Sequence, residues 1–150
     1  MFTDASAGYV KPTGGGGTAL AQQVTQTVKP DDQVVVVFPS PSDSEQSRDA
    51  VRSAARTTYA QIKATAPGTK LIVVGQSWTS DNVPSNVTGL RDTLRAEAAA
   101  AGAVFVDPLT DKWFVNDTGK LVGSDGVHLT DQGHKYLADQ LQPRIAAALG

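Results

Sequence analysis

The run Val34-Val35-Val36-Val37-Phe38 is the stretch that most clearly predicts a strand in this chain of 150 residues. It is rich in β-branched side chains and does not alternate between apolar and polar positions, which is typical of a strand buried on both faces of its sheet. The runs Leu71-Ile72-Val73-Val74 and Val104-Phe105-Val106 share both properties. Together the three runs predict a parallel sheet, because crossover helices cover both faces of such sheets.

The segments between these runs have the periodicity of amphipathic helices. Their apolar positions share one face in each case: Ala50, Val51, Ala54, Ala55, Tyr59 and Ile62 in the first segment, and Val87, Leu90, Leu94 and Ala98 in the second. The alternation of strands and helices therefore predicts an α/β fold.

Two more helices are expected outside this central part. One runs from Thr18 to Lys29, after the glycine run 14–17, which is expected to be a loop. The other begins at about Asp131, with Thr130 as its cap, and reaches Leu149. Pro143 is expected to bend or interrupt this last helix, because proline lacks the N–H that a helix interior uses.

Length and composition favour one domain over residues 1–150 and argue against several functions. The 13 basic and 15 acidic residues are scattered and form no basic stripe for nucleic acid. With no cysteine and with histidines only at 128 and 134, the chain matches no common metal-ligand spacing, and no cofactor is implied. No apolar run is long enough to span a membrane, and no signal peptide is evident. We expect a soluble protein and leave its compartment open.

The stretch Ser124-Asp125-Gly126-Val127-His128-Leu129-Thr130 carries the strongest chemical signal. An aspartate three residues before a histidine on one loop can orient the imidazole, which then takes a proton from a nucleophile. In open α/β sheets, ligands bind beyond the carboxyl ends of the strands, here at 39–44, at 75–80 and from 107 onward. The Asp125–His128 loop follows the last strand and can reach the same edge. His134 is expected to be structural or exposed.

The same stretch, with Gly133-His134 behind it, resembles the last motif of the SGNH (GDSL-type) hydrolases, a family of α/β serine esterases and lipases. The segments 71–78 and 104–108 are similar to the later strands of that family, so the resemblance covers nearly the whole chain. It implies a flavodoxin-like three-layer sandwich with a parallel sheet, and it implies that Asp125 and His128 are the aspartate and histidine of a catalytic triad. Members of this family are often secreted.

Two other family motifs are altered or missing. No strand ending in Gly-Asp-Ser, the motif that supplies the nucleophile, precedes Ala5. The segment 5–10 resembles the second motif, which implies that Gly8 donates a backbone N–H to the oxyanion. The segment 39–43 stands where Gly-x-Asn-Asp is expected, with Pro39 for the glycine and Ser42 for the oxyanion-binding asparagine. Loss of one such donor typically costs about 3 to 4 kcal/mol of transition-state stabilisation.

The sequence therefore does not identify the nucleophile, and the candidates are Ser6, Ser40, Ser42 and Ser77. Ser77 follows a strand within Gly75-Gln76-Ser77, whereas Ser6 follows no strand. Asp43 and Ser44 have two readings: they cap a helix that begins near Glu45, or they shape the site.

The absent strand would lie beside the run 34–38, at the centre of the sheet in the family that this chain resembles. Its absence would expose an apolar edge, and such edges pair with other chains. We expect that the chain is an N-terminally truncated fragment, or that its own N-terminal residues or a second copy cover this edge.

Two functions follow. The first is an ester hydrolase with His128 as base, Asp125 as its partner and an oxyanion hole at Gly8 and Ser42, acting on small acyl esters such as acetylated carbohydrates or short lipids. The second is a catalytically inactive relative that serves as a binding or assembly module.

Overall fold

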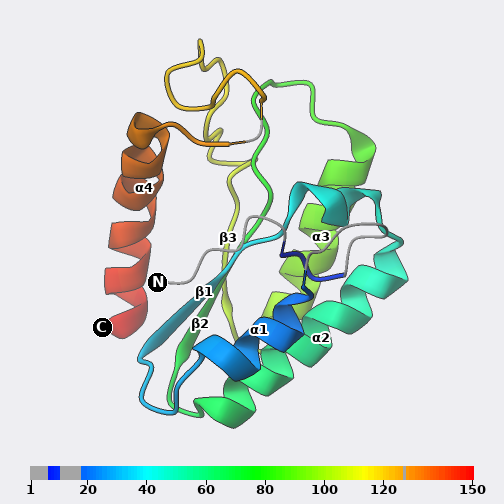
Figure 1. The fold of residues 1–150 in the computed structure, drawn as a ribbon, viewed down its shortest axis with the longest axis vertical. Coiled ribbons are helices and arrows are strands. Elements are labelled where there is room, and N and C mark those ends of the chain that lie inside the picture. Colours follow the sequence, from blue (N-terminus) through cyan, green and yellow to red (C-terminus); the bar gives the residue numbers. More distant parts are fainter. Residues whose placement is uncertain (1–6, 11–17, 127) are drawn as a thin grey trace.

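A computed structural model describes residues 7–10, 18–126 and 128–150. The elements follow in the order α1 (Leu20–Thr27), β1 (Val34–Val37), the 3₁₀ helix η1 (Pro41–Glu45), α2 (Arg48–Thr65), β2 (Lys70–Val74), α3 (Ser85–Ala100), β3 (Val104–Val106) and α4 (Asp131–Leu149) (Figure 1). The three strands and the intervening helices match the segments predicted from the sequence.

The sheet is parallel and has the strand order β1-β2-β3. Val34 is opposite Lys70 in the first pairing, and Ile72 is opposite Val104 in the second. The central strand β2 is buried from Leu71 to Val74, as predicted. The outer strands are more open, because each has a neighbour on one side only among the described residues; Val104 of β3 is 45% exposed.

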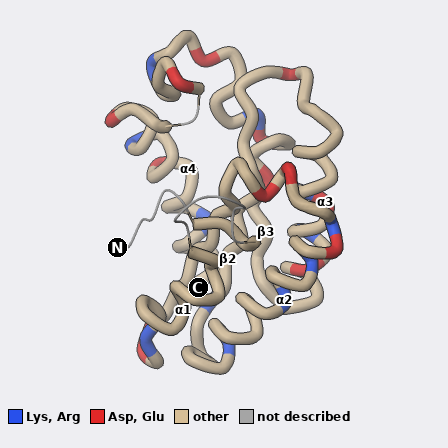
Figure 2. The backbone as a smooth tube through the Cα atoms, turned by 45° about the vertical axis from the view of Figure 1, so that its right-hand side comes forward, with Lys and Arg blue, Asp and Glu red and all other residues tan. Residues whose placement is uncertain are grey.

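Helices cover both faces of this sheet, which gives the predicted three-layer α/β sandwich (Figure 1). On one face, α1, α2 and α3 bury residues that include Val24, Tyr59 and Leu94. On the other face, α4 packs Leu137 and other apolar side chains against Ile72, Val74 and Val106. Acidic and basic residues are interspersed along α2 and α3 (Figure 2).

The expected interruption at Pro143 is wrong, because α4 continues through this residue to Leu149. The missing proline N–H removes one hydrogen bond, whereas packing of Leu137, Leu141 and Ile145 against the sheet favours the helix on both sides of it. The first helix is also shorter than expected: α1 occupies 20–27 rather than 18–29. The glycine run 14–17 lies outside the described residues.

The segment after β1 also differs from expectation. Residues 41–45 form η1, and α2 begins only at Arg48, where the Ser47 hydroxyl caps it by accepting a hydrogen bond from the Ala50 N–H (3.2 Å). Asp43 and Ser44 therefore do not cap α2. Both are buried on the turn that leads from the carboxyl end of β1 to α2.

Candidate active site

The Asp125–His128 loop closes a short hairpin in front of α4. Val122 and Leu129 form an antiparallel bridge at its base. The N–H of Gly123 donates to the carbonyl of His128 (2.7 Å), and Gly126 has a φ of 71°, a value that favours glycine.

This loop brings the two side chains of the predicted pair into contact. Nδ1 of His128 lies 2.5 Å from Oδ2 of Asp125, and the His128 N–H donates to Oδ1 of the same carboxylate (2.9 Å). The two bonds fix the ring relative to its own loop. With Nδ1 engaged by the carboxylate, Nε2 is the ring nitrogen that can exchange a proton with a substrate. Both side chains are open to solvent, at 70% for His128 and 51% for Asp125.

The predicted oxyanion residues gather at the carboxyl end of β1. A Cβ placed on Gly8 would lie 3.1 Å from Cβ of Ser40 and 3.0 Å from both carboxylate oxygens of Asp43, so Gly8 packs directly on this turn. The Ser40 and Ser42 hydroxyls are 3.0 Å apart and hydrogen-bond to each other. The structure thus brings Gly8 to the 40–43 turn.

A pocket of about 500 Å³ lies beyond the carboxyl ends of the strands. Its wall includes Phe38, Gly75, Ser77, Trp78, Trp113, Phe114 and Leu129. Pro41, one residue from Ser42, lines one side, and Gly126, within the Asp-His loop, lines another. Gly8, Ser42, Asp125 and His128 are not themselves among the residues that line the pocket; it borders their segments through Pro41 and Gly126, at the edge where parallel sheets bind ligands.

Sequence reasoning missed the aromatic wall of this pocket. Trp113 and Phe114 are buried on the loop after β3, where Lys112, Phe114 and Asn116 have φ values of 54°, 61° and 60°. Side chains other than glycine rarely adopt this conformation, and each such residue costs on the order of 1 kcal/mol or more. Asparagine adopts this conformation more readily than most residues, but lysine and phenylalanine rarely do, so the sequence did not predict the turns at Lys112 and Phe114 that place the aromatic wall.

Asp117 holds the end of this loop. Its carboxylate accepts hydrogen bonds from the N–H groups of Lys120 (3.1 Å), Leu121 (3.1 Å) and Val122 (2.9 Å). The bond from Val122 lowers the pKa of Asp117 below its usual value, and those from Leu121 and Lys120 act in the same direction against desolvation. The carboxylate thus stabilises this turn.

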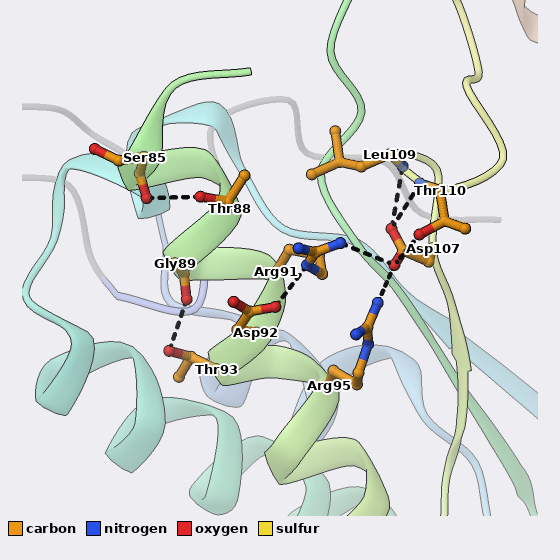
Figure 3. A network of polar contacts seen from close by, with 10 residues as sticks. All are labelled: Ser85, Thr88, Gly89, Arg91, Asp92, Thr93, Arg95, Asp107, Leu109 and Thr110. Atoms are coloured by element: carbon orange, nitrogen blue, oxygen red, sulfur yellow. Dashed lines mark hydrogen bonds and ion pairs between the residues drawn. The ribbon is translucent and has the colours of Figure 1, made fainter. Parts of the chain in front are cut away.

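Asp107 ties the start of the same loop to α3 (Figure 3). Its carboxylate is paired with Arg91 (3.2 Å) and with Arg95, and it accepts hydrogen bonds from the N–H groups of Leu109 and Thr110. Partial burial acts to raise the pKa of Asp107, but the hydrogen bonds from Thr110 and the charge of Arg91 outweigh it, and the pKa is lowered.

The other predicted positions lie away from the pocket or outside the described residues. His134 is exposed, and its Nδ1 lies 3.0 Å from the carbonyl of Thr130. Ser6 belongs to the segment 1–6 and lies outside the described residues. Within residues 7–10, 18–126 and 128–150 there is no group of three or more acidic, histidine or cysteine side chains arranged to hold a metal ion. In the same ranges no helix has the length and apolar character to cross a membrane.

A parallel sheet between two helical layers is the fold that the sequence resemblance implies. Residues 5–136 match the GDSL-like lipase/acylhydrolase family, and the chain belongs to this family. The resemblance inferred from the sequence is thereby confirmed.

The relatives agree with this assignment. The chain is 40% identical over 152 residues to "GDSL lipase Rv0518" of Mycobacterium tuberculosis (strain ATCC 25618 / H37Rv), a match that covers 99% of this chain and 65% of the relative. The chain thus spans about 65% of the length of that relative.

Solved structures share the fold at low identity. A Lactobacillus plantarum protein has a TM-score of 0.71 at 14% identity, covering 95% of this chain and 77% of its own. A carbohydrate esterase family 3 from Talaromyces cellulolyticus has a TM-score of 0.65 at 19% identity, and the match covers 87% of this chain and 63% of the esterase chain. TesA has a TM-score of 0.68 at 14% identity, and the match covers 88% of this chain and 77% of the TesA chain.

Proposed function

We propose that this chain carries the acid-base machinery of an ester hydrolase. The observation that carries the proposal is the 2.5 Å contact between His128 Nδ1 and Asp125 Oδ2 on a loop that borders the pocket. Nε2 of His128 takes the proton of a serine hydroxyl as its oxygen attacks the ester carbonyl, and then gives that proton to the departing alkoxide. In the second half of the reaction, Nε2 takes a proton from water, the water oxygen attacks the acyl-serine, and the carboxylate is released as the proton returns to the serine.

Two groups on the β1 side of the pocket are suited to stabilise the oxyanion. The Gly8 backbone supplies an N–H, and Ser42 supplies a hydroxyl where the family pattern has asparagine. The Ser40–Ser42 contact supports this role, because a hydrogen bond donated by Ser40 leaves the Ser42 proton free to point at the oxyanion.

Ser77 is the nucleophile candidate that the pocket favours. It lines the pocket at the end of β2, whereas Ser40 and Ser42 bond to each other. Ser6 and a serine outside this sequence are the other sources, and the chain's 65% share of its relative's length keeps the latter open.

The pocket favours uncharged acyl groups. Its wall is largely aromatic and aliphatic, and Glu45 is the one charged residue among the lining residues that the structure describes. A carboxylate at this position disfavours anionic substrates and leaves small neutral esters as the best fit. The relative named as a GDSL lipase and the neighbour named as a carbohydrate esterase support esters of this general kind.

The alternative is an inactive binding or assembly module. Two observations favour it: the exposure of His128 at 70%, and a proline and a serine at positions 39 and 42, where the family motif has glycine and asparagine. Such a module would retain the pocket without turnover.

A serine-reactive fluorophosphonate tests the proposal. The serine oxygen bonds to phosphorus and fluoride leaves, so intact mass should rise by one label in the wild type, while His128→Ala should stay unlabelled. Peptide mapping, together with Ser77→Ala, identifies the serine.

A folded wild-type chain that takes no label would contradict hydrolysis by any serine of this chain, Ser77 included. Binding of butyramide, followed by the emission of Trp78 and Trp113, would then favour the inactive module, since both tryptophans of the chain line the pocket.

A further inference from the structure

Asp43 is a fully buried carboxylate whose partners are backbone N–H groups. Its exposed fraction is 0%. Oδ2 accepts hydrogen bonds from the N–H of Ser40 (2.8 Å) and of Tyr9 (3.1 Å), and Oδ1 accepts one from the N–H of Val10 (3.1 Å). A buried charge of this kind is tolerated only when strong hydrogen bonds replace its lost hydration.

Only one of these three bonds belongs to the turn that carries Asp43. The bond to Ser40 closes the start of η1, which is ordinary capping. The bonds to Tyr9 and Val10 cross 34 and 33 residues of sequence. A residue that served only as a cap would need neither of them, so capping does not explain the burial of both oxygens.

The distant segment is shaped to receive this carboxylate. A Cβ on Gly8 would lie 3.0 Å from each oxygen of Asp43, a separation at which the neighbour must give way. Tyr9 adds a second anchor, because its hydroxyl lies 2.7 Å from that of Tyr59 on α2. The absence of a side chain at Gly8 lets the backbone lie directly on the carboxylate.

The turn is held from its other side by Arg48. One guanidinium nitrogen of Arg48 donates to the carbonyls of Asp43 (3.3 Å), Ser44 (2.9 Å) and Gln46 (2.7 Å). The turn therefore has little freedom to follow the Gly8 segment if that segment moves. Arg48 ties the turn to α2, and Asp43 ties the Gly8 segment to the turn. The same segment is also held by the Leu20 N–H, which donates to the Gly8 carbonyl (2.8 Å), and by the Tyr9–Tyr59 contact.

We propose that Asp43 is the positioning residue of the oxyanion site, fixing the backbone at Gly8 against the Ser40–Ser42 turn through both carboxylate oxygens. The proposal rests on the proposed function for the roles of Gly8 and Ser42. Asp43 does not touch the substrate; it acts by holding the segment that includes the Gly8 N–H.

The first test is amide hydrogen exchange in Asp43→Asn. An asparagine keeps the size of the side chain but has only one acceptor oxygen. Its NH₂ group is a donor and cannot accept a hydrogen bond from a backbone N–H. Exchange at Tyr9 and Val10 should rise at least about tenfold, the equivalent of about 1.4 kcal/mol, while the amides of Ile72 and Val73 in β2 keep their protection. The exposed Asp31→Asn is the matched control and should change neither set.

Gly8→Ala disturbs the same contact by adding a Cβ to the Gly8 segment, and it leaves the Asp43 carboxylate in place. It should also speed exchange at Tyr9 and Val10, so the proposal stays testable if Asp43→Asn does not fold. Unchanged exchange at these amides in either folded variant would overturn the proposal.

Steady-state kinetics distinguish a positioning role of Asp43 from a general effect on stability. With p-nitrophenyl butyrate as substrate, Asp43→Asn should lower kcat and leave KM unchanged, because the oxyanion forms only in the transition state. Equal changes in both parameters would argue against positioning. A wild type without turnover would refute the proposed function alone, since the exchange experiment needs no activity.

Discussion

Gly133 lies where α4 passes the backbone that precedes the Asp-His loop. A Cβ at this position would be 1.9 Å from the carbonyl oxygen of Leu121, which already accepts a hydrogen bond from the Thr130 N–H (2.9 Å). The oxygen belongs to the backbone, so it cannot rotate away as a side chain would. Glycine is required here for close approach, and the approach holds the Asp125–His128 loop against α4.

We therefore expect Gly133→Ala to lower the free energy of unfolding by about 1 to 3 kcal/mol, as overpacking does. Gly89→Ala is the matched control, because its added Cβ meets only Cδ of Arg48, at 3.7 Å. Gly89→Ala should raise the free energy of unfolding by up to about 1 kcal/mol, because alanine is favoured over glycine inside a helix by about that amount. Urea denaturation measures both, and equal stability of Gly133→Ala and wild type would rule out the close approach.

Asp117 makes stability depend on acidic pH. Its folded pKa lies below the usual value of 3.8, so its contribution is complete above that value and is lost as the pH falls through the folded pKa. We expect the unfolding free energy of Asp117→Asn to fall less steeply than that of wild type as the pH drops below about 5. Urea titrations at several pH values measure the slopes. A variant slope equal to that of wild type and of the exposed control Asp31→Asn would show that the Asp117 hydrogen bonds do not matter.

At the residue scale, the sequence predicted the Asp125–His128 pair but not the hydrogen bonds that Asp43 makes. Asp125 and His128 were recognisable because three residues of sequence separate them, and their contact is local. The bonds of Asp43 to Tyr9 and Val10 are long-range contacts of a carboxylate with backbone N–H groups. Any residue other than proline offers such a donor, so the sequence carried no record of them.

Secondary-structure elements were the most predictable level of this molecule. The apolar runs that became β1, β2 and β3 are short and uniform, and the helices between them have apolar faces that match the buried positions, including Val51, Tyr59 and Leu94. Errors arose where packing outweighed local preference. Pro143 lies inside α4 because the apolar residues around it face the sheet.

Pro143 should therefore destabilise a helix that packing maintains. We expect Pro143→Ala to raise the free energy of unfolding by about 1 to 3 kcal/mol, through the recovered hydrogen bond and the relief of ring crowding. The exposed neighbour Gln142→Ala should change stability little and serves as control. Thermal and urea unfolding measure both variants, and a less stable Pro143→Ala would mean that the proline is needed where it lies.

Strand β1 is one of the two edge strands of the sheet in the described part of the chain, and its free edge can pair with another chain. Among the described residues, β1 pairs with β2 alone. The carbonyl of Gln33 accepts the N–H of Lys70 (2.8 Å). Because parallel partners bond at alternate residues, Val34 and Val36 direct their backbone groups away from β2. Free strand edges of this kind pair with other chains.

We expect the 150-residue chain to self-associate through this edge. Val36→Pro removes an outward N–H without removing a bond to β2, so it should shift the chain toward monomer in sedimentation velocity. Val36→Ala keeps the outward N–H, so it is the control and should leave the association state unchanged. A wild type that is monomeric at all concentrations would refute the expectation.

The most direct test of the site as a whole is the initial rate of p-nitrophenyl butyrate hydrolysis by the wild-type chain, His128→Ala and His134→Ala in parallel. Loss of a general base typically costs about 100-fold or more, so His128→Ala should lose nearly all activity. His134→Ala should retain it, because the His134 side chain is exposed and its Nδ1 lies 3.0 Å from the carbonyl of Thr130. Equal hydrolysis by wild type and His128→Ala would show that the Asp125–His128 pair does not act on the ester.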